Sequence, residues 1–287
     1  MNVFLNGCSY TEDVGFDRNW SNALVNNTNW NITNYAKGGS GNRFICETTL
    51  DFLDNNEKLL PDLVIIMWSG LTRKDVEITK EEYEDMCTKQ GENRYVGFSE
   101  REGRYWLGSG GVWGNGSVPL AEEFPNNPVA PKLLNKYFDG YWLYGNPLER
   151  AKESIDYMNK LQGYLKTRQI PYVFTTYQNY WNKDSKQMLK EKLYIDVTEQ
   201  FSYNSGGSPY IRDFKKLNKY AFHMLDFNKF CWAGPNKGRT IFELAMEDFP
   251  GRTGTYDDGD HPGYEAGEKF VNEYLLPKVK QLYQIDR

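Results

Sequence analysis

Residues that commonly hold metal ions are scarce in this sequence. It contains two histidines, and its four cysteines lie far apart with no Cys-x-x-Cys pair (Cys8, Cys46, Cys87 and Cys231). A structural zinc site needs such ligands close together, so we expect no metal and no other cofactor. Scattered cysteines also favour a reducing compartment over a disulfide framework.

Long apolar runs and an excess of basic residues are lacking as well. The apolar stretch after Met1 covers Val3–Leu5 with no basic segment before it, and no run approaches the roughly 20 apolar residues of a membrane span. The formal net charge of -5 offers no basic surface to nucleic acid. We therefore expect a cytoplasmic protein without membrane or nucleic-acid partners; later release or assembly into a particle stays open.

Aromatic residues, by contrast, are abundant, at 16% of the chain. Most aromatic side chains serve in a protein core, yet tyrosine and tryptophan also stack on sugar rings and other planar groups. With 287 residues the chain is long enough to bury a substantial core. We predict a single domain that covers residues 1–287.

The first part of the chain alternates apolar segments with helical patterns, and each apolar segment ends in a turn of small residues. Strand, helix, strand, helix and strand are expected at Val3–Leu5, 17–28, 29–36, 44–55 and 63–68, with Leu24 and Val25 on the apolar face of the first helix. This βαβαβ start predicts a three-layer α/β/α fold with a central parallel sheet. Because crossovers are right-handed, the turns at Ser9, Gly39 and Thr72 should meet at the ligand-binding edge of that sheet.

The turn after the second strand, Lys37 to Arg43, is rich in glycine, so its backbone can approach a ligand closely and present amide N–H groups. The helix that follows favours a negative charge at its start. The turn lacks the Gly-x-x-x-x-Gly-Lys-Ser/Thr spacing of a nucleotide-binding loop. An ordinary strand-to-helix loop is the alternative.

Residues 74–146 interrupt this pattern with an irregular segment rich in glycine, tyrosine and tryptophan. Long irregular segments inside a domain are usually functional. We predict an insertion over the active edge of the sheet that forms a lid or a substrate wall. The alternative is an aromatic cluster that packs only on itself.

The regular pattern returns in the second half of the chain. Helices are expected at 148–168, 183–194, 212–224, 240–246 and 264–283, and a further strand at 170–177. His223 lies in one of these helices and is assigned a structural role. His261 lies in the loop before the closing helix, three residues after Asp258. At this spacing a turn can bring the carboxylate to one ring nitrogen and leave the other nitrogen free for a partner.

Together these motifs resemble those of the SGNH (GDSL-type) hydrolase superfamily. Gly7–Tyr10 is similar to the first block of that superfamily, with Cys8 where Asp is frequent. Asn34, followed five residues later by Gly39, is similar to the second block, and Asp258–Pro262 is similar to the last. Each motif alone is common, since a serine after a glycine is usually a plain turn residue. Their order and placement over nearly the whole chain are far more specific.

The resemblance implies a flavodoxin-like SGNH-hydrolase fold and a catalytic triad. In that triad Ser9 is the nucleophile, His261 the general base and Asp258 the carboxylate that orients the imidazole. The backbone amides of Ser9 and Gly39 would form the oxyanion hole, with Thr72 as a third donor.

The third block departs from the superfamily pattern. Where that pattern has Gly-x-Asn-Asp, this chain has Gly70-Leu71-Thr72-Arg73. Thr72 stands in the Asn position, so its hydroxyl would replace the side-chain amide, and Arg73 would contribute charge. The opening Gly-Cys-Ser-Tyr-Thr also resembles proteins of tailed phages and their bacterial hosts, which leaves a viral origin open.

These observations predict a serine hydrolase that cleaves a carboxylic ester through an acyl-enzyme. The aromatic segment favours an acylated carbohydrate, such as an O-acetyl sugar, over a long-chain lipid. Three alternatives remain: an acyltransferase with the same site, a non-catalytic glycan-binding or phage-particle protein that retains the fold, and a nucleotide-binding flavodoxin-like protein. The last leaves the placement of Asp258 and His261 unexplained. The substrate-binding residues and the oligomeric state are not predicted.

Overall fold

The computed structural model describes residues 1–12, 19–71, 73–89, 98–108, 147–177, 214–234, 239–249 and 261–284. Its centre is a four-stranded parallel sheet with the strand order β2-β1-β3-β7. The strands are β1 (Asn2–Asn6), β2 (Asn31–Asn34), β3 (Leu63–Trp68) and β7 (Tyr172–Thr176). Every residue of β3 and β7 is buried, as expected for parallel strands that are covered on both faces.

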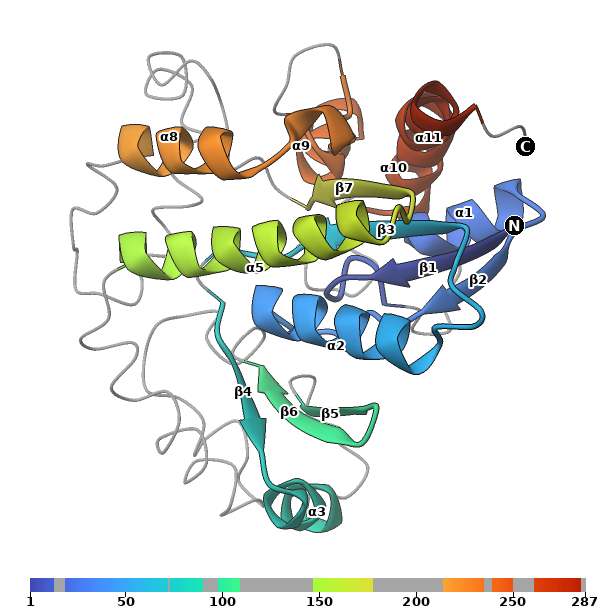
Figure 1. Ribbon diagram of the computed structural model, residues 1–287. Coiled ribbons are helices and arrows are strands. Elements are labelled where there is room, and N and C mark those ends of the chain that lie inside the picture. Colours follow the sequence, from blue (N-terminus) through green and yellow to red (C-terminus); the bar gives the residue numbers. More distant parts are fainter. Residues whose placement is uncertain are drawn as a thin grey trace.

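Helices cover both faces of this sheet (Figure 1). The chain moves from β1 to β2, crosses back over β1 to β3, and continues in that direction to β7. Because right-handed crossovers set the face by the direction of travel, α1 (Trp20–Asn27) lies on one face, and α2 (Asn42–Asn55) and α5 (Pro147–Thr167) lie on the other. The predicted α/β fold with a central parallel sheet is confirmed.

The apolar faces of the helices follow the 3.6-residue period, with one exception. On α5, Ile155, Met158 and Leu161 are fully buried, as their spacing predicts. On α1, Leu24 is fully buried but Val25 is 51% exposed. The prediction for Val25 is wrong because adjacent helix positions differ by about 100° around the axis, so the next residue turns away from the sheet.

The remaining helices of the described residues complete the two outer layers. They are α8 (Phe214–Met224), the 3₁₀ turn Phe227–Lys229, α9 (Ile241–Asp248), and a continuous closing helix made of α10 (Tyr264–Lys269), a π-helical segment (Phe270–Leu275) and α11 (Leu276–Tyr283). α8 packs beside α5, and α10 packs beside α1 and α9. His223 is exposed in the last turn of α8 and is not part of the core. The expected helix at 183–194 lies outside the described residues.

A second, smaller sheet occupies the start of the segment that the sequence predicted to be irregular. It is antiparallel, in the order β4-β6-β5, and consists of β4 (Asp75–Ile78), β6 (Arg104–Gly108) and β5 (Phe98–Arg101), with α3 (Lys80–Lys89) after β4. The prediction of an irregular segment is therefore wrong for the described residues 75–89 and 98–108. These strands are short and interleave charged with apolar residues, so they give no long apolar run.

The second sheet packs on α2 (Figure 1). Arg104 of β6 binds Asp51 of α2 at 2.7 Å and Glu77 of β4 at 2.9 Å. Trp106 of β6 contacts the ring of Phe44, with the centroids 5.7 Å apart. Residues 109–146 lie outside the described part of the chain, so a lid or substrate wall stays a prediction for them.

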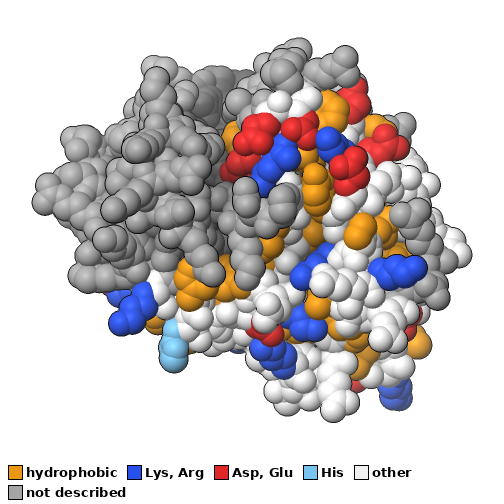
Figure 2. Space-filling model, turned by 90° about the horizontal axis from the view of Figure 1, so that it is seen from above, with side chains coloured by type: hydrophobic (Ala, Val, Ile, Leu, Met, Phe, Trp, Pro, Cys, Tyr) orange, Lys and Arg blue, Asp and Glu red, His pale blue; other side chains and the backbone are white. Residues whose placement is uncertain are grey.

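Charged side chains of both signs lie side by side on the face shown in Figure 2. In the described residues one such group joins α9 to α10: Arg239 binds Glu247 and Asp248, and Asp248 also binds Lys269 at 2.8 Å. Cys8, Cys46 and Cys231 are buried free thiols. Among the helices that the structure describes, none is long and apolar enough to cross a membrane.

Candidate active site

The end of β1 is anchored to α2 by a buried asparagine. The side-chain amide of Asn6 donates to the carbonyl of Ile45 and to the hydroxyls of Thr48 and Thr49, at 2.9–3.2 Å. Its oxygen accepts from the backbone N–H of Gly7 at 2.8 Å. The chain therefore leaves the sheet at a fixed point and in a fixed direction.

Ser9 lies in the tight turn that follows. The carbonyl of Cys8 accepts hydrogen bonds from the amides of Thr11 and Glu12, at 2.8 and 3.0 Å, and these bonds close the turn. Cys8 is fully buried, whereas Ser9 is partly exposed. The hydroxyl of Ser9 is thus presented at the carboxyl edge of the sheet, where the sequence predicts it.

His261 reaches this hydroxyl from the other end of the chain. It directly precedes the Pro262-Gly263 step that opens α10, and its Nε2 lies 2.8 Å from Ser9 Oγ. That separation lies within the range for a general base and the proton that it abstracts. The structure therefore brings together two residues that are 252 positions apart.

The imidazole of His261 also packs against aromatic rings. The ring of Tyr10 lies 4.7 Å from that of His261 and 4.5 Å from that of Tyr177, between centroids. The guanidinium of Arg73 lies 5.7 Å from the centre of the Tyr177 ring. These contacts build a wall of buried aromatic rings beside the imidazole.

Arg73 is held on the other side of this wall. Its Nη1 donates to the hydroxyl of Ser69 at 2.9 Å and to the carbonyl of Ser40 at 3.3 Å. Arg73 thus connects the turn after β3 to the turn after β2. The charge that Arg73 is expected to contribute to the site remains a prediction.

The glycine-rich turn after β2, residues 37–41, lies beside the Ser9 turn and is called the Gly39 loop below. The backbone N–H of Lys37 donates to the carbonyl of Gly7 at 3.1 Å. Glu12 adds two contacts, an ion pair with Lys37 at 2.7 Å and a hydrogen bond from the Gly38 amide at 2.6 Å. Gly39 itself has a φ of 79°, a backbone angle that residues other than glycine rarely adopt.

Two backbone amides of these turns have no protein acceptor among the described residues, and one of them belongs to the buried Gly39. Within the described residues, neither the N–H of Ser9 nor that of Gly39 donates a hydrogen bond to the protein. Unused amides at the tips of two adjacent turns can stabilise a developing negative charge.

The start of α2 is occupied by a carboxylate of the protein itself. Asp75 accepts hydrogen bonds from the amides of Gly41, at 2.7 Å, and Phe44, at 2.9 Å. Burial raises the pKa of Asp75 to about 6, although these two hydrogen bonds and the charges of Arg73 and Arg43 lower it. The negative charge expected at this helix start is therefore internal, which argues against a phosphate site there.

A buried asparagine joins α2 to the turn after β3. The oxygen of Asn42 accepts from the amide of Ser69 at 2.8 Å, and its nitrogen donates to the carbonyls of Ser69 and Gly70 at 3.2 and 3.4 Å. The sequence motifs did not indicate Glu12, Asn42 and Asp75. No motif marks them, because each acts on a partner from another segment of the chain.

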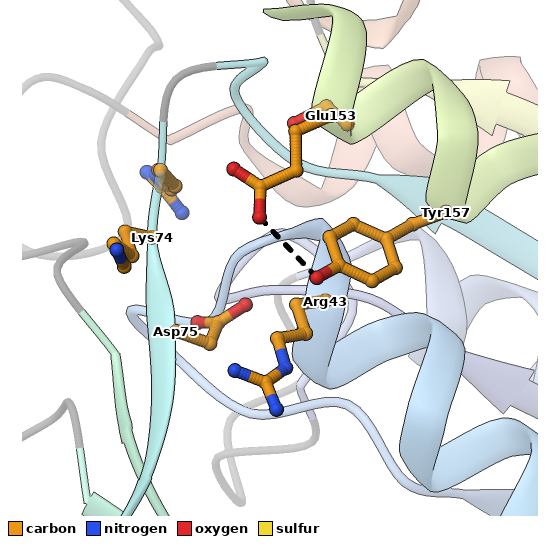
Figure 3. Close-up of a pocket in the computed structure, with 7 residues that line it drawn as sticks. Arg43, Lys74, Asp75, Glu153 and Tyr157 are labelled. Atoms are coloured by element: carbon orange, nitrogen blue, oxygen red, sulfur yellow. Dashed lines mark hydrogen bonds between the residues drawn. The ribbon is translucent and has the colours of Figure 1, made fainter. Parts of the chain in front are cut away.

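Thr72 and Asp258 lie outside the described residues, so their predicted roles stay predictions. The pocket in Figure 3 lies between β4, α2 and α5 and is lined by residues of both charges, among them Arg43, Lys74 and Glu153. Neither Ser9 nor His261 lines it. In the part of the chain that the structure describes, no group of three or more His, Cys, Asp and Glu residues could hold a metal ion.

No family model matches the chain, and no curated protein matches it. Solved structures do resemble it. A protein described as a GDSL-like lipase, from Parabacteroides merdae, is 12% identical, with a TM-score of 0.39, over 99% of this chain and 96% of the other. A catalytic mutant of an acetylxylan esterase from Geobacillus stearothermophilus is 10% identical, with a TM-score of 0.40, over 97% and 93%.

A second variant of that acetylxylan esterase is 11% identical, with a TM-score of 0.36, over 100% of this chain and 96% of the other. The names of these two proteins are a GDSL-like lipase and an acetylxylan esterase. Likeness of this extent assigns neither family nor substrate. The proposed function therefore rests on the geometry around Ser9.

Proposed function

We propose that this chain is a serine esterase of the SGNH type that removes O-acyl groups, such as acetyl, from a carbohydrate. The observation that carries the proposal is the 2.8 Å separation between Ser9 Oγ and His261 Nε2. A serine hydroxyl is a weak nucleophile unless a base is in place to take its proton.

In the first step Ser9 Oγ attacks the carbonyl carbon of the ester, and His261 Nε2 takes the hydroxyl proton. The tetrahedral intermediate carries a negative charge on the former carbonyl oxygen. When the intermediate collapses, the bond to the leaving alcohol breaks, and His261 returns the proton to that alcohol. The product left on the protein is an acyl group on Ser9.

In the second step a water molecule takes the place of the alcohol. His261 removes a proton from this water, the hydroxide attacks the acyl carbon, and the proton then returns to Ser9 as the acid departs. A second alcohol in the place of water would make the same site an acyltransferase. Asp258 is proposed to hold the imidazole in the tautomer that both steps need.

The oxyanion is proposed to lie at the tips of the two adjacent turns. The unused amides of Ser9 and Gly39 are the donors, and Thr72 is a proposed third one. Loss of a single oxyanion donor in a serine protease costs about 10²- to 10³-fold in rate. The amides matter most here because the chain lacks the asparagine of the superfamily pattern.

The carbohydrate part of the proposal rests on aromatic side chains. Tyr10 and Tyr177 are buried, so the support comes from the many aromatic residues that follow in the sequence between 109 and 146. Flat rings of this kind pack against the apolar faces of sugars. A panel of acetylated oligosaccharides and p-nitrophenyl esters of increasing chain length tests this point; faster cleavage of long-chain esters would contradict it.

The first experiment is the hydrolysis of p-nitrophenyl acetate by the wild-type protein and by Ser9→Ala. We expect activity in the wild type and none above the buffer rate in the variant. A fluorophosphonate probe should label the peptide that contains Ser9 and no other. Glycan binding that survives Ser9→Ala, in a wild-type protein that neither hydrolyses esters nor takes the probe, would instead identify a non-catalytic binding protein.

A further inference from the structure

The Gly39 loop is in contact with the second sheet at two points. Asp75, the first residue of β4, is 2% exposed, and its carboxylate accepts from Gly41, the last residue of the loop, and from Phe44 in the first turn of α2. Gly108, the last residue of β6, pairs with Asp75 in the register of that sheet. A methyl group on Gly108 would lie 2.7 Å from the carbonyl oxygen of Gly39. Gly108 therefore lies against the backbone of Gly39.

These contacts bear on the direction of the Gly39 amide. Glycine has little conformational preference of its own, so neighbouring groups must fix its backbone. Glu12 holds the amide of Gly38 on one side of Gly39, and Asp75 holds the amide of Gly41 on the other. Gly108 limits the movement of the carbonyl between them.

We propose that Asp75 is a positioning residue of the oxyanion hole: by holding Gly41 and the start of α2, it fixes the direction of the Gly39 amide. Gly108 completes this support from β6. The inference rests on the proposed function and deepens it, because it gives the second sheet a role in catalysis without contact to the substrate.

The charged groups around Asp75 fit a positioning role. Arg73 and Arg43 are the basic groups that act on its carboxylate, and Arg73 is itself bound to Ser40 of the Gly39 loop. Asp75 also lines the pocket in Figure 3, together with Lys74, Glu153 and Tyr157. Both of its carboxylate oxygens accept from backbone amides, at Gly41 and Phe44.

The test compares Asp75→Asn with Glu77→Gln, a matched change of the neighbouring carboxylate on β4. Asparagine keeps one acceptor and replaces the other with a donor that would face an amide. We expect kcat on p-nitrophenyl acetate to fall about tenfold to 100-fold in Asp75→Asn with little change in KM, because the amide acts on the transition state. Glu77→Gln should leave both constants unchanged. Equal kcat values for all three proteins would overturn the proposal.

A double-variant experiment asks whether Asp75 acts through Gly39. If it does, adding Asp75→Asn to Gly39→Ala should lower kcat little further, since residues that act as a unit are not additive. Multiplicative effects would overturn the proposal. Gly108→Ala disturbs the same loop from β6 and should lower kcat as well. If Asp75→Asn does not fold, Gly108→Ala is compared with the wild type in its place. An unchanged kcat in Gly108→Ala would then count against the proposal.

Hydrogen exchange separates this inference from the proposed function. In a Ser9→Ala background, amide exchange of the peptide spanning 37–44 should be faster in Asp75→Asn than in Glu77→Gln, whether or not the protein cleaves esters. A wild-type protein without esterase activity would contradict the proposed function alone. Unchanged exchange in Asp75→Asn would contradict the positioning role alone.

Discussion

The two halves of the candidate site are held in different ways. The Ser9–His261 pair joins a nucleophile and its proposed base from opposite ends of the chain through a hydrogen bond, with the ring of Tyr10 packed beside the imidazole. The Gly39 loop is held by several polar groups from other segments, chiefly Glu12 and Asp75. The reactivity of the nucleophile should therefore fail with a single substitution, whereas the support of the oxyanion hole should weaken in steps.

The largest effect is expected in the half that is proposed to transfer the proton. His261→Ala should lower kcat/KM by about four orders of magnitude or more, because Ser9 loses its base. The thermal midpoint should change little, since His261 is partly exposed. His223→Ala, which removes the exposed histidine of α8, is the matched control and should retain full activity. If His261→Ala and His223→Ala had similar kcat/KM values, His261 would not be the base for Ser9.

The next effect concerns Gly39, the residue of the Gly39 loop whose positive φ restricts it to glycine. Gly39→Ala should lower kcat by about 10²- to 10³-fold, because a side chain at this φ costs about 1–2 kcal/mol and turns the amide away. Gly103→Ala is matched, since Gly103 has a φ of 74° with open space around it in the β5–β6 turn. It should cost stability without loss of rate. Equal rates in the two variants would show that the Gly39 amide has no catalytic role.

A third effect concerns how the stability that Asp75 contributes depends on pH. The pKa of Asp75 is raised from 3.8 to about 6 on folding, so the native state binds more protons between these values. Stability due to this group is complete below about pH 4 and is lost as the pH rises through 6, a difference of about 3 kcal/mol. Urea unfolding at pH 4, 5, 6 and 7 should show this fall in the wild type relative to Asp75→Asn. A constant difference between the two would contradict it.

The smallest effect is expected for a single polar support of the loop. Glu12→Gln keeps an acceptor for the Gly38 amide but removes the charge that Lys37 binds. We expect kcat to fall about threefold to tenfold, in line with the loss of about 1 kcal/mol from a charge-assisted contact. Lys80→Met, which breaks the exposed Lys80–Glu84 pair, is the control and should have no effect. A loss as large as that of Gly39→Ala would mean that the loop is not supported in steps.

Sequence patterns predicted the elements whose signal is local. The apolar run 63–68 forms β3, and Ile155, Met158 and Leu161, which recur at helical spacing, form the buried face of α5. The approach of Ser9 to His261 was implied by the resemblance to the SGNH superfamily, whose motifs put the serine after the first strand and Asp-x-x-His before the last helix. The roles of Asp258 and Thr72 remain predictions.

The second sheet and the support of the Gly39 loop could not be predicted in the same way. β4, β5 and β6 are four or five residues long and owe their stability to pairing with one another and to packing on α2. Asp75 gives no signal because its two partners lie more than 30 positions away. Long-range hydrogen bonds depend on the finished fold, and residue spacing does not encode them.

The 252 positions between Ser9 and His261 also set an order of events during synthesis. The ribosome releases the serine early and its base much later, so the hydroxyl exists for most of translation without a group that can activate it. Any ester-cleaving ability would arise only when the closing helix docks beside α1. Labelling of Ser9 by an activity-based probe would then report the completion of folding, and a stalled nascent chain would stay unlabelled.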